Sequence, residues 1–371
     1  MNNIVQPLLE EYQLGDLTLK NRIVMASLTR ARATNSGLVP TAIMAEYYAQ
    51  RATAGLILSE GTWVNPQSIG FINVPGIYTQ EQVEGWKTVT KAVHASGGLI
   101  FSQLGHIGAG AHPDLQNGEI PVAPSAINIE SQSFTPEGFK STITPRELTV
   151  DEIKETVQDY KTAAQNAKDA GFDGVEIHAI AGMLIPQFLS IASNIRTDAY
   201  GGSIENRSRI IFEILDAVTE VWDSERVAIK FSPVMLNSVG IVKPDVETIA
   251  LFKYILNKLS LYNLAFVHVV GPSEDLSDTP VRELQENYFS HFRKNYSGRI
   301  LANLGFSKDS ANAILEEGDA VLVSFGEPFI ANPDLAERFR YNLPLSLSDR
   351  ETFYSGGENG YITYPKATYP D

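Results

Sequence analysis

Short apolar runs alternate with longer stretches of helical periodicity along the whole chain of 371 residues. Eight runs are rich in β-branched residues and are bounded by polar residues or glycine, which is typical of buried strands. They lie at 22–26, 55–60, 98–104, 173–178, 226–232, 264–270, 299–303 and 320–325. Because strands that alternate with helices form parallel sheets, the eight runs predict an α/β fold: a single (β/α)8 TIM barrel over residues 1–371.

Local signals predict where several helices begin and end. The stretch Thr149 to Glu152 reads as a capping box, and Gly171 lies where a glycine ends a helix. Ser203 marks the start of another helix. Near the C-terminus, Asn332 followed by proline predicts an N-cap and a first helical turn.

The segment 105–148 is rich in Gly, Pro, Ser and Asn and is too long for an ordinary strand-to-helix loop. We predict that it forms a lid or a small hairpin over the barrel mouth. In such barrels the chemistry lies at the C-terminal ends of the strands. The polar and loop positions at these ends are therefore the candidate site: Thr29, Gly61, Gln103, His106, His178, Lys230, 303–306 and 326–329.

Composition narrows the possible partners. The chain has no cysteine, which excludes disulfides, thiolate metal sites and cysteine nucleophiles. Its net charge of −15 argues against nucleic acid and anionic membranes as partners. No apolar run approaches the roughly 18 residues of a membrane span, and no secretory signal is visible. We expect a soluble, cytoplasmic protein that acts on a small molecule and holds no metal.

Long windows around the predicted strand ends resemble the old yellow enzyme family of flavin-dependent ene-reductases. They include "LTLKNRIVMASLTRARA", "YYAQRATAGLILSEGT", "FDGVEIHAIAGMLIPQFLSIASNIRTDAYGGSIENRSR", "FGEPFIANPDLAERF" and "GGENGYITYP". The resemblance covers nearly the whole chain. It implies FMN at the barrel mouth, NAD(P)H as the reductant, and hydride transfer to an α,β-unsaturated carbonyl compound.

Several cofactor positions of the family match. By resemblance, the flavin contacts are Thr29, Gly61, Gln103, His178, Lys230, Gly305, Phe306, Gly326 and Tyr361. Lys230 stands where the family has arginine, so it keeps the charge and loses the planar fork. Ser27 replaces a proline of the family motif.

Four positions depart from the family pattern and fall into two functions. Ala181 replaces the second donor to the substrate carbonyl, and Met183 replaces the tyrosine that delivers a proton. With Phe71, they predict an apolar substrate pocket. Leu304 replaces a phosphate-site glycine, and Glu327 replaces the phosphate-binding arginine. A carboxylate repels phosphate by roughly 4 kcal/mol at 4 Å and an effective dielectric near 20, so we expect weak or lost FMN binding.

These departures favour a non-redox or atypical enzyme. It would carry out an isomerisation, cyclisation or addition on an unsaturated carbonyl compound of specialised metabolism, with His178, Lys230, His106 and Tyr361 as the catalytic candidates. The alternative is an FMN-dependent NAD(P)H:ene oxidoreductase, and a third hypothesis is a silent ligand-binding relative. By analogy with the family, a homodimer is possible.

Some of the candidates also have structural interpretations. Lys230 either faces a ligand or pairs with a carboxylate such as Glu60 or Glu176. His268, within an apolar strand, is expected to be a hydrogen-bonded core residue. Glu327 has the simpler interpretation of a solvated loop residue.

Overall fold

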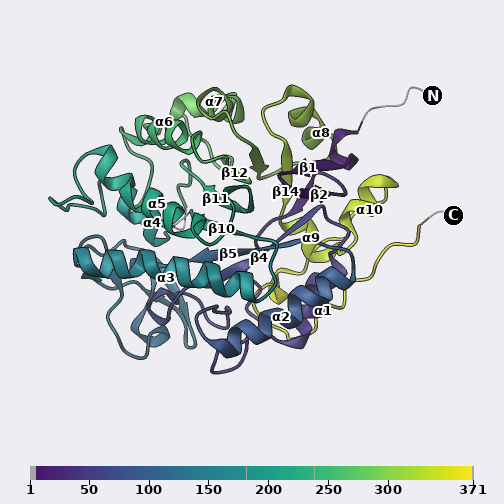
Figure 1. Cartoon of the computed structure of the whole chain (residues 1–371), viewed down its shortest axis with the longest axis horizontal. Coiled ribbons are helices and arrows are strands. Elements are labelled where there is room, and N and C mark those ends of the chain that lie inside the picture. Colours follow the sequence, from purple (N-terminus) through teal and green to yellow (C-terminus); the bar gives the residue numbers. More distant parts are fainter. Residues whose placement is uncertain (1–5, 181, 238, 370–371) are drawn as a thin grey trace.

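A computed structural model describes residues 6–180, 182–237 and 239–369, and eight parallel strands in it close into a barrel (Figure 1). The strand order around the barrel is β10-β11-β12-β13-β14-β3-β4-β5. The barrel strands are β3 (Ile23–Met25), β4 (Leu56–Trp63), β5 (Ile100–Gly105), β10 (Gly174–Ala179), β11 (Val227–Phe231), β12 (Phe266–Val270), β13 (Ile300–Asn303) and β14 (Leu322–Phe325). Each overlaps one of the eight predicted runs, so the TIM-barrel prediction is confirmed.

Helices surround the strands on the outside of the barrel (Figure 1). They are α1 (Ala42–Gln50), α2 (Gln80–Ala95), α3 (Val150–Asp169), α4 (Leu184–Leu189), α5 (Ile204–Thr219), α6 (Thr248–Leu259), α7 (Tyr288–Asn295), α8 (Lys308–Glu317), α9 (Glu327–Ala331) and α10 (Leu335–Arg340). The Thr149 hydroxyl accepts the Glu152 N–H at 3.2 Å, and the Glu152 carboxylate accepts the Thr149 N–H at 2.8 Å, which completes the predicted capping box. Gly171 follows α3 with φ +83°, a conformation that favours glycine.

The N-terminal hairpin closes one end of the barrel. Strands β1 (Tyr12–Leu14) and β2 (Leu17–Leu19) pair antiparallel, and their leucines pack against the inward-facing residues where the barrel strands begin. This end is filled by apolar side chains such as Leu58 and Phe101. The C-terminal strand ends at the opposite mouth are the part of the barrel that carries polar side chains.

The segment between β5 and α3 contains a hairpin of β7 (Gln132–Thr135) and β8 (Gly138–Ser141), and the short paired strands β6 (Val122–Ala123) and β9 (Arg146–Glu147). On the hairpin, Phe134 packs against Phe71 with ring centroids 5.0 Å apart. Phe71 also packs against Tyr354 of the C-terminal segment at 5.2 Å. Three segments that are distant in the sequence therefore meet in one aromatic cluster.

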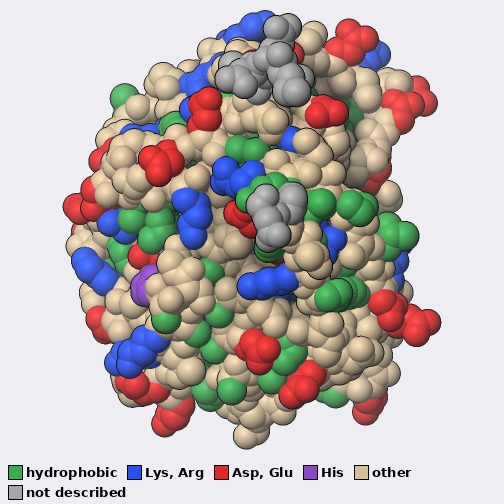
Figure 2. Space-filling model, turned by 90° about the vertical axis from the view of Figure 1, so that its right-hand side faces the viewer, with side chains coloured by type: hydrophobic (Ala, Val, Ile, Leu, Met, Phe, Trp, Pro, Cys, Tyr) green, Lys and Arg blue, Asp and Glu red, His purple; other side chains and the backbone are tan. Residues whose placement is uncertain are grey.

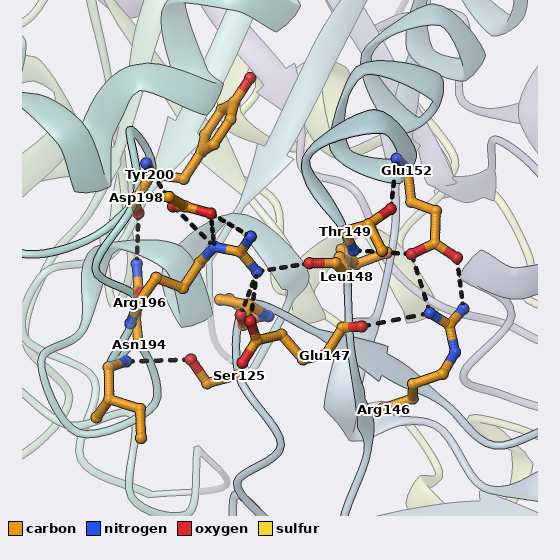
Figure 3. Close-up of polar contacts among 12 residues, drawn as sticks. Ser125, Arg146, Glu147, Leu148, Thr149, Glu152, Asn194, Arg196, Asp198 and Tyr200 are labelled. Atoms are coloured by element: carbon orange, nitrogen blue, oxygen red, sulfur yellow. Dashed lines mark hydrogen bonds and ion pairs between the residues drawn. The ribbon is translucent and has the colours of Figure 1, made fainter.

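Arg196 ties the base of this segment to the loop after α4 (Figure 3). Its guanidinium donates to the main-chain oxygens of Pro124 and Leu148 at 2.7 and 2.6 Å, and it pairs with Asp198 at 2.5 Å. Because the side chain is buried, these contacts replace its lost hydration. Both ends of the hairpin segment are thus fixed to the barrel.

The prediction for Asn332 is wrong. The segment after β14 is the short helix α9, which begins at Glu327, and the next helix begins only at Leu335. Asn332 ends α9, and its amide donates to the oxygens of Pro328 and Ser346 at 2.8 and 3.1 Å. Asparagine and the following proline therefore mark a helix end here, because the side chain bonds backward as well as to a distant segment.

Two fully buried arginines after β3 hold the C-terminal segment against the barrel. Arg30 donates to the main-chain oxygens of Phe353 and Gly360 at 3.0 and 2.8 Å. Arg32 donates to Thr352 at 2.8 Å and to Phe353 at 2.9 Å, and it also bonds the oxygens of Arg30, Ser355 and Gly357. All five N–H groups of Arg32 are thereby used.

We expect Arg32→Met to lower the free energy of unfolding by about 3–5 kcal/mol, because it leaves several buried carbonyl oxygens without donors. Chemical denaturation followed by circular dichroism measures this change. Arg350→Met is the matched control, since Arg350 is exposed. Equal losses in the two variants would contradict the role of Arg32.

Candidate functional site

The mouth brings together most of the predicted site residues. Gly61 on β4 lies in register with Gln103 on β5, and His178 on β10 lies in register with Lys230 on β11. Thr29 follows β3 and is partly exposed, as are Gly61 and His178. The (β/α)8 topology therefore places one residue from each of five consecutive strands or strand ends around a single opening.

A chain of hydrogen bonds crosses the interior below this opening. The Ser27 hydroxyl donates to Gln103 Oε1 at 2.6 Å, and Gln103 Nε2 donates to Glu176 Oε2 at 2.6 Å. The other Glu176 oxygen meets His268 Nδ1 at 2.7 Å, and His268 Nε2 meets the Ser324 hydroxyl at 2.9 Å. His268 is therefore the hydrogen-bonded core residue that the sequence predicted.

Lys230 is a buried cation without a direct partner. Its side chain is 5% exposed, and its ammonium makes no hydrogen bond or ion pair among the described residues. Neither pairing considered from the sequence forms as a direct contact. Glu176 uses its oxygens on Gln103 and His268, and Glu60 accepts N–H groups elsewhere. Burial lowers the pKa of Lys230, and the charge of Glu176 opposes that shift.

His178 is a neutral imidazole at the mouth. Burial, followed by the nearby Lys230 charge, lowers its pKa to about 3, so it carries no charge near neutral pH. Its Nδ1 is buried and has no hydrogen-bond partner among the described residues. A side chain added at Gly61 would lie 3.7 Å from this nitrogen, at ordinary contact distance. His178 therefore has unused hydrogen-bonding capacity at Nδ1, and Gly61 beside it leaves room for an added methyl group.

The wall next to His178 is apolar. Met183 is buried, and its Cε lies within 2.8 Å of where a Cβ on Gly105 would be. Met183 packs with Trp63 and Val74, and Phe71 borders the same cluster. Ala181 lies outside the described residues, so its predicted place in the pocket stays a prediction.

Two catalytic candidates are enclosed by protein. His106 is fully buried, its Nδ1 accepts the Gly108 N–H at 3.0 Å, and burial lowers its pKa to about 3. Tyr361 is also fully buried, stacked on Tyr47 with centroids 4.0 Å apart. These contacts give His106 and Tyr361 clear structural roles, and their catalytic roles stay predictions.

The loops after β13 and β14 form the predicted phosphate end. The N–H groups of Gly305, Phe306 and Gly326 make no hydrogen bond among the described residues, so they are available to an anion. Leu304 keeps a glycine-like φ of +98° and is 38% exposed. Such a backbone costs roughly 1–3 kcal/mol for a residue other than glycine.

Glu327 is exposed at the start of α9, where its Oε1 accepts the Ser348 hydroxyl at 3.0 Å. A carboxylate is favourable at a helix N-terminus even without a ligand, which gives this residue a structural reason. The phosphate end therefore keeps its main-chain donors, while one side chain adds bulk and another adds repulsion.

The ring end and the phosphate end differ in how well they fit FMN. At the ring end, Gln103 retains donors and acceptors, Lys230 lacks a direct partner among the described residues, and Gly61 leaves room for an added methyl group. At the phosphate end, the main-chain N–H groups suit an anion, whereas the side chains of Leu304 and Glu327 do not. Together with the barrel, these features are those of a TIM-barrel flavoprotein.

Comparison with known proteins defines the family. Residues 7–346 match the NADH:flavin oxidoreductase / NADH oxidase family, so the chain belongs to that family and the resemblance to old yellow enzymes is confirmed. It is 40% identical to putative 12-oxophytodienoate reductase 5 of Oryza sativa subsp. japonica, over 98% of this chain and 96% of that protein. It is also 40% identical to flavin oxidoreductase hxnT of Emericella nidulans, over 98% of both proteins.

Solved structures agree with this assignment. The structure of morphinone reductase superposes with a TM-score of 0.91 at 42% identity, covering 98% of both chains. An old yellow enzyme homologue from Zymomonas mobilis gives a TM-score of 0.89 at 39% identity, covering 96% of this chain and 99% of that one. The family is enzymatic and binds FMN, so these comparisons do not support the expectation that FMN binding is lost.

Among residues 6–180, 182–237 and 239–369, no group of three or more His, Asp or Glu side chains is placed to hold a metal ion. Within the same ranges, no helix has the length and apolar character needed to cross a membrane. On the face in Figure 2, acidic and basic side chains are interspersed.

Sequence reasoning missed two buried carboxylates that organise the site. Glu176 was considered only as a partner for Lys230, yet it joins Gln103 to His268. Glu60 accepts the N–H groups of Arg30 and Ala31, both at 3.2 Å, and so fixes the turn after Thr29. The available signal was a glutamate inside each of two apolar strand runs, at interior-facing positions.

Glu60 generates a pH prediction, because burial raises its pKa from 4.5 to about 7. The folded protein then holds this proton more tightly than the unfolded chain. Its contribution to stability is complete below about pH 4.5 and is lost as the pH rises to about 7. In Glu60→Gln we expect this part of the pH dependence, roughly 3 kcal/mol, to disappear. Urea denaturation between pH 5 and 8 measures it, with the exposed Glu119→Gln as control.

Proposed function

We propose that the chain is an FMN-dependent NAD(P)H oxidoreductase that reduces the carbon–carbon double bond of an α,β-unsaturated carbonyl compound. The observation that carries this proposal is the ring end of the mouth: an ordered Gln103 amide, a buried Lys230 cation without a direct partner, and a neutral His178 beside them. The family match and the reductase names of its relatives support it.

The protein holds FMN mainly by its ring in this proposal. Thr29, Gln103 and Lys230 would face the ring system, and the free N–H groups at Gly305, Phe306 and Gly326 would receive the phosphate. When bound, FMN supplies the hydride chemistry between NAD(P)H and the substrate. Lys230 offers a positive charge toward the electron-rich edge of the ring, without the bidentate geometry of arginine.

His178 orients and polarises the substrate. A neutral imidazole donates one N–H to the carbonyl oxygen, where negative charge develops during reduction. Ala181 offers no second side-chain donor, and Met183 has no proton to deliver. The substrate's second hydrogen therefore comes from solvent in this proposal, and the apolar wall of Met183, Trp63 and Phe71 favours an apolar carbon skeleton.

A second candidate is a non-redox enzyme on the same substrate class, acting by isomerisation, cyclisation or addition. The observation that favours it is the phosphate end, where Leu304 holds a strained backbone and Glu327 lies exposed at the start of α9. It keeps His178 and Lys230 as polarising groups in a mouth without flavin. A homodimer and a cytoplasmic location remain predictions under both candidates.

The deciding experiment is the visible spectrum of the purified protein with and without added FMN. A stoichiometric yellow complex that NADH or NADPH bleaches, and that an unsaturated ketone reoxidises, is the result expected here. A protein that binds no FMN at saturating concentrations, yet converts such a ketone, would establish the second candidate instead.

We expect Glu327→Arg to tighten FMN binding by ~10- to 100-fold, because an attractive charge replaces a repulsive one at a partly screened site. Titration of flavin fluorescence measures the dissociation constant. Glu316→Arg is the matched control, since it makes the same charge change near the far end of the ten-residue helix α8, about 12 Å from its start. Riboflavin, which lacks the phosphate, should not distinguish Glu327→Arg from the natural protein.

We expect His178→Ala to lower kcat/KM for an unsaturated ketone by ~10²–10³-fold, since it removes the one side-chain donor to the carbonyl oxygen. Stopped-flow kinetics separates the two half-reactions. Reduction of the protein by NAD(P)H and reoxidation by the ketone are followed in turn, and the loss should be larger in the ketone step. A variant as fast as the natural protein would exclude His178 from carbonyl polarisation.

A further inference from the structure

We propose that Glu176 is a positioning residue for the ring end of the site: its carboxylate fixes the direction of the Gln103 amide and supplies the counter-charge for Lys230. The inference rests on the proposed function, because Gln103 and Lys230 face a flavin ring only if FMN binds. Glu176 itself is fully buried on β10 and lies below the mouth rather than in it.

The direction of the Gln103 amide follows from what its neighbours can donate. An ionised carboxylate only accepts hydrogen bonds, so the Gln103 nitrogen must face Glu176, as it does at 2.6 Å. At the other end, the Ser27 hydroxyl donates to Gln103 Oε1 at 2.6 Å. One N–H and one lone pair of the amide then remain for a ligand. Because the amide cannot flip, the positions of this donor and this acceptor are fixed.

The far side of Glu176 is held by a chain that ends at the barrel wall. Asn303 Nδ2 donates to the Ser324 hydroxyl at 2.7 Å, and this hydroxyl meets His268 Nε2 at 2.9 Å. His268 is then a neutral ring that donates from Nδ1 to Glu176 at 2.7 Å. The carboxylate thus receives one donor on each oxygen, which is the arrangement that suits its charged form.

The charge of Glu176 also serves Lys230. On β10 the residues Glu176 and His178 face the same way, and Lys230 is the register partner of His178 on β11. The titratable groups that face Lys230 are thus Glu176, His178 and His268, and both histidines are neutral near pH 7 because burial lowers their pKa values. Without Glu176, the buried ammonium would have no opposite charge facing it among the described residues.

The pKa of Glu176 agrees with this geometry. Burial alone would raise it, but His268, Lys230 and the Gln103 amide together hold it below its usual range. A single carboxylate thereby couples an amide on one neighbouring strand to a cation on the other. Replacing it with glutamine keeps the volume, removes the charge and introduces a donor that permits the Gln103 amide to turn over.

The first test uses the purified protein without added cofactor. With 15N-labelled lysine, the Nζ signal of Lys230 is assigned by its loss in Lys230→Arg, and its titration is followed by NMR. We expect Glu176→Gln to lower the Lys230 pKa by about one unit or more. Glu213→Gln, which removes a carboxylate bound to Tyr200 away from the mouth, should leave the titration unchanged. A folded Glu176→Gln protein with an unchanged Lys230 titration overturns the proposal.

The second test measures FMN affinity by fluorescence. We expect about tenfold weaker binding in Glu176→Gln and in Glu176→Asp, because both lose the contact that orients Gln103. Glu176→Asp keeps the charge, so its Lys230 titration should remain as in the natural protein, and it serves if the glutamine variant does not fold. Unchanged FMN affinity in these variants overturns the proposal. If the natural protein binds no FMN, the proposed function fails, and the Lys230 titration still decides the role of Glu176.

Discussion

The mouth of this barrel depends on buried charged side chains that bond main-chain groups instead of forming direct ion pairs. Arg30 and Arg32 donate to main-chain oxygens of the C-terminal segment, and Glu60 accepts main-chain N–H groups of the turn after β3. Removing one such group leaves several main-chain atoms unpaired in a medium where each is costly. These contacts join the first and last parts of the chain, and they fix the turn that carries Thr29.

The two ends of the site differ in how deeply their side chains are buried. The ring end lies inside the barrel, where Gln103 and Lys230 are buried. The phosphate end lies at exposed loops, where the side chains of Leu304 and Glu327 lie outside the core. Exposure explains why the Glu327 carboxylate is compatible with an intact fold, since surface substitutions usually alter stability little, whereas Leu304 carries a strained backbone.

The sequence allowed the architecture to be predicted because apolar periodicity and capping residues act locally. All eight barrel strands and the capping box at Thr149 follow from it. Asn332 was interpreted wrongly, because its amide bonds a distant segment that no local pattern indicates. The chain from Ser27 to Ser324 joins the turn after β3 to residues on four other strands, so only the closed barrel brings its members together. Strand position predicted which residues face the mouth, but not which of them bond each other.

The place of a substitution in the site also determines whether it would alter the affinity for FMN or the reaction itself. A phosphate far from the reacting atoms is bound equally in the ground state and the transition state, so it contributes affinity and not rate. In the proposed function the ring end and His178 act where charge develops, and they lie in the buried part of the mouth. Under the proposed function, a chain without the family's arginine at position 327 would keep its chemistry, whereas the absence of donors at 181 and 183 would act on the reacting atoms. The proposed function thus makes affinity for FMN and reactivity toward a carbonyl substrate separable properties, set at opposite ends of one site.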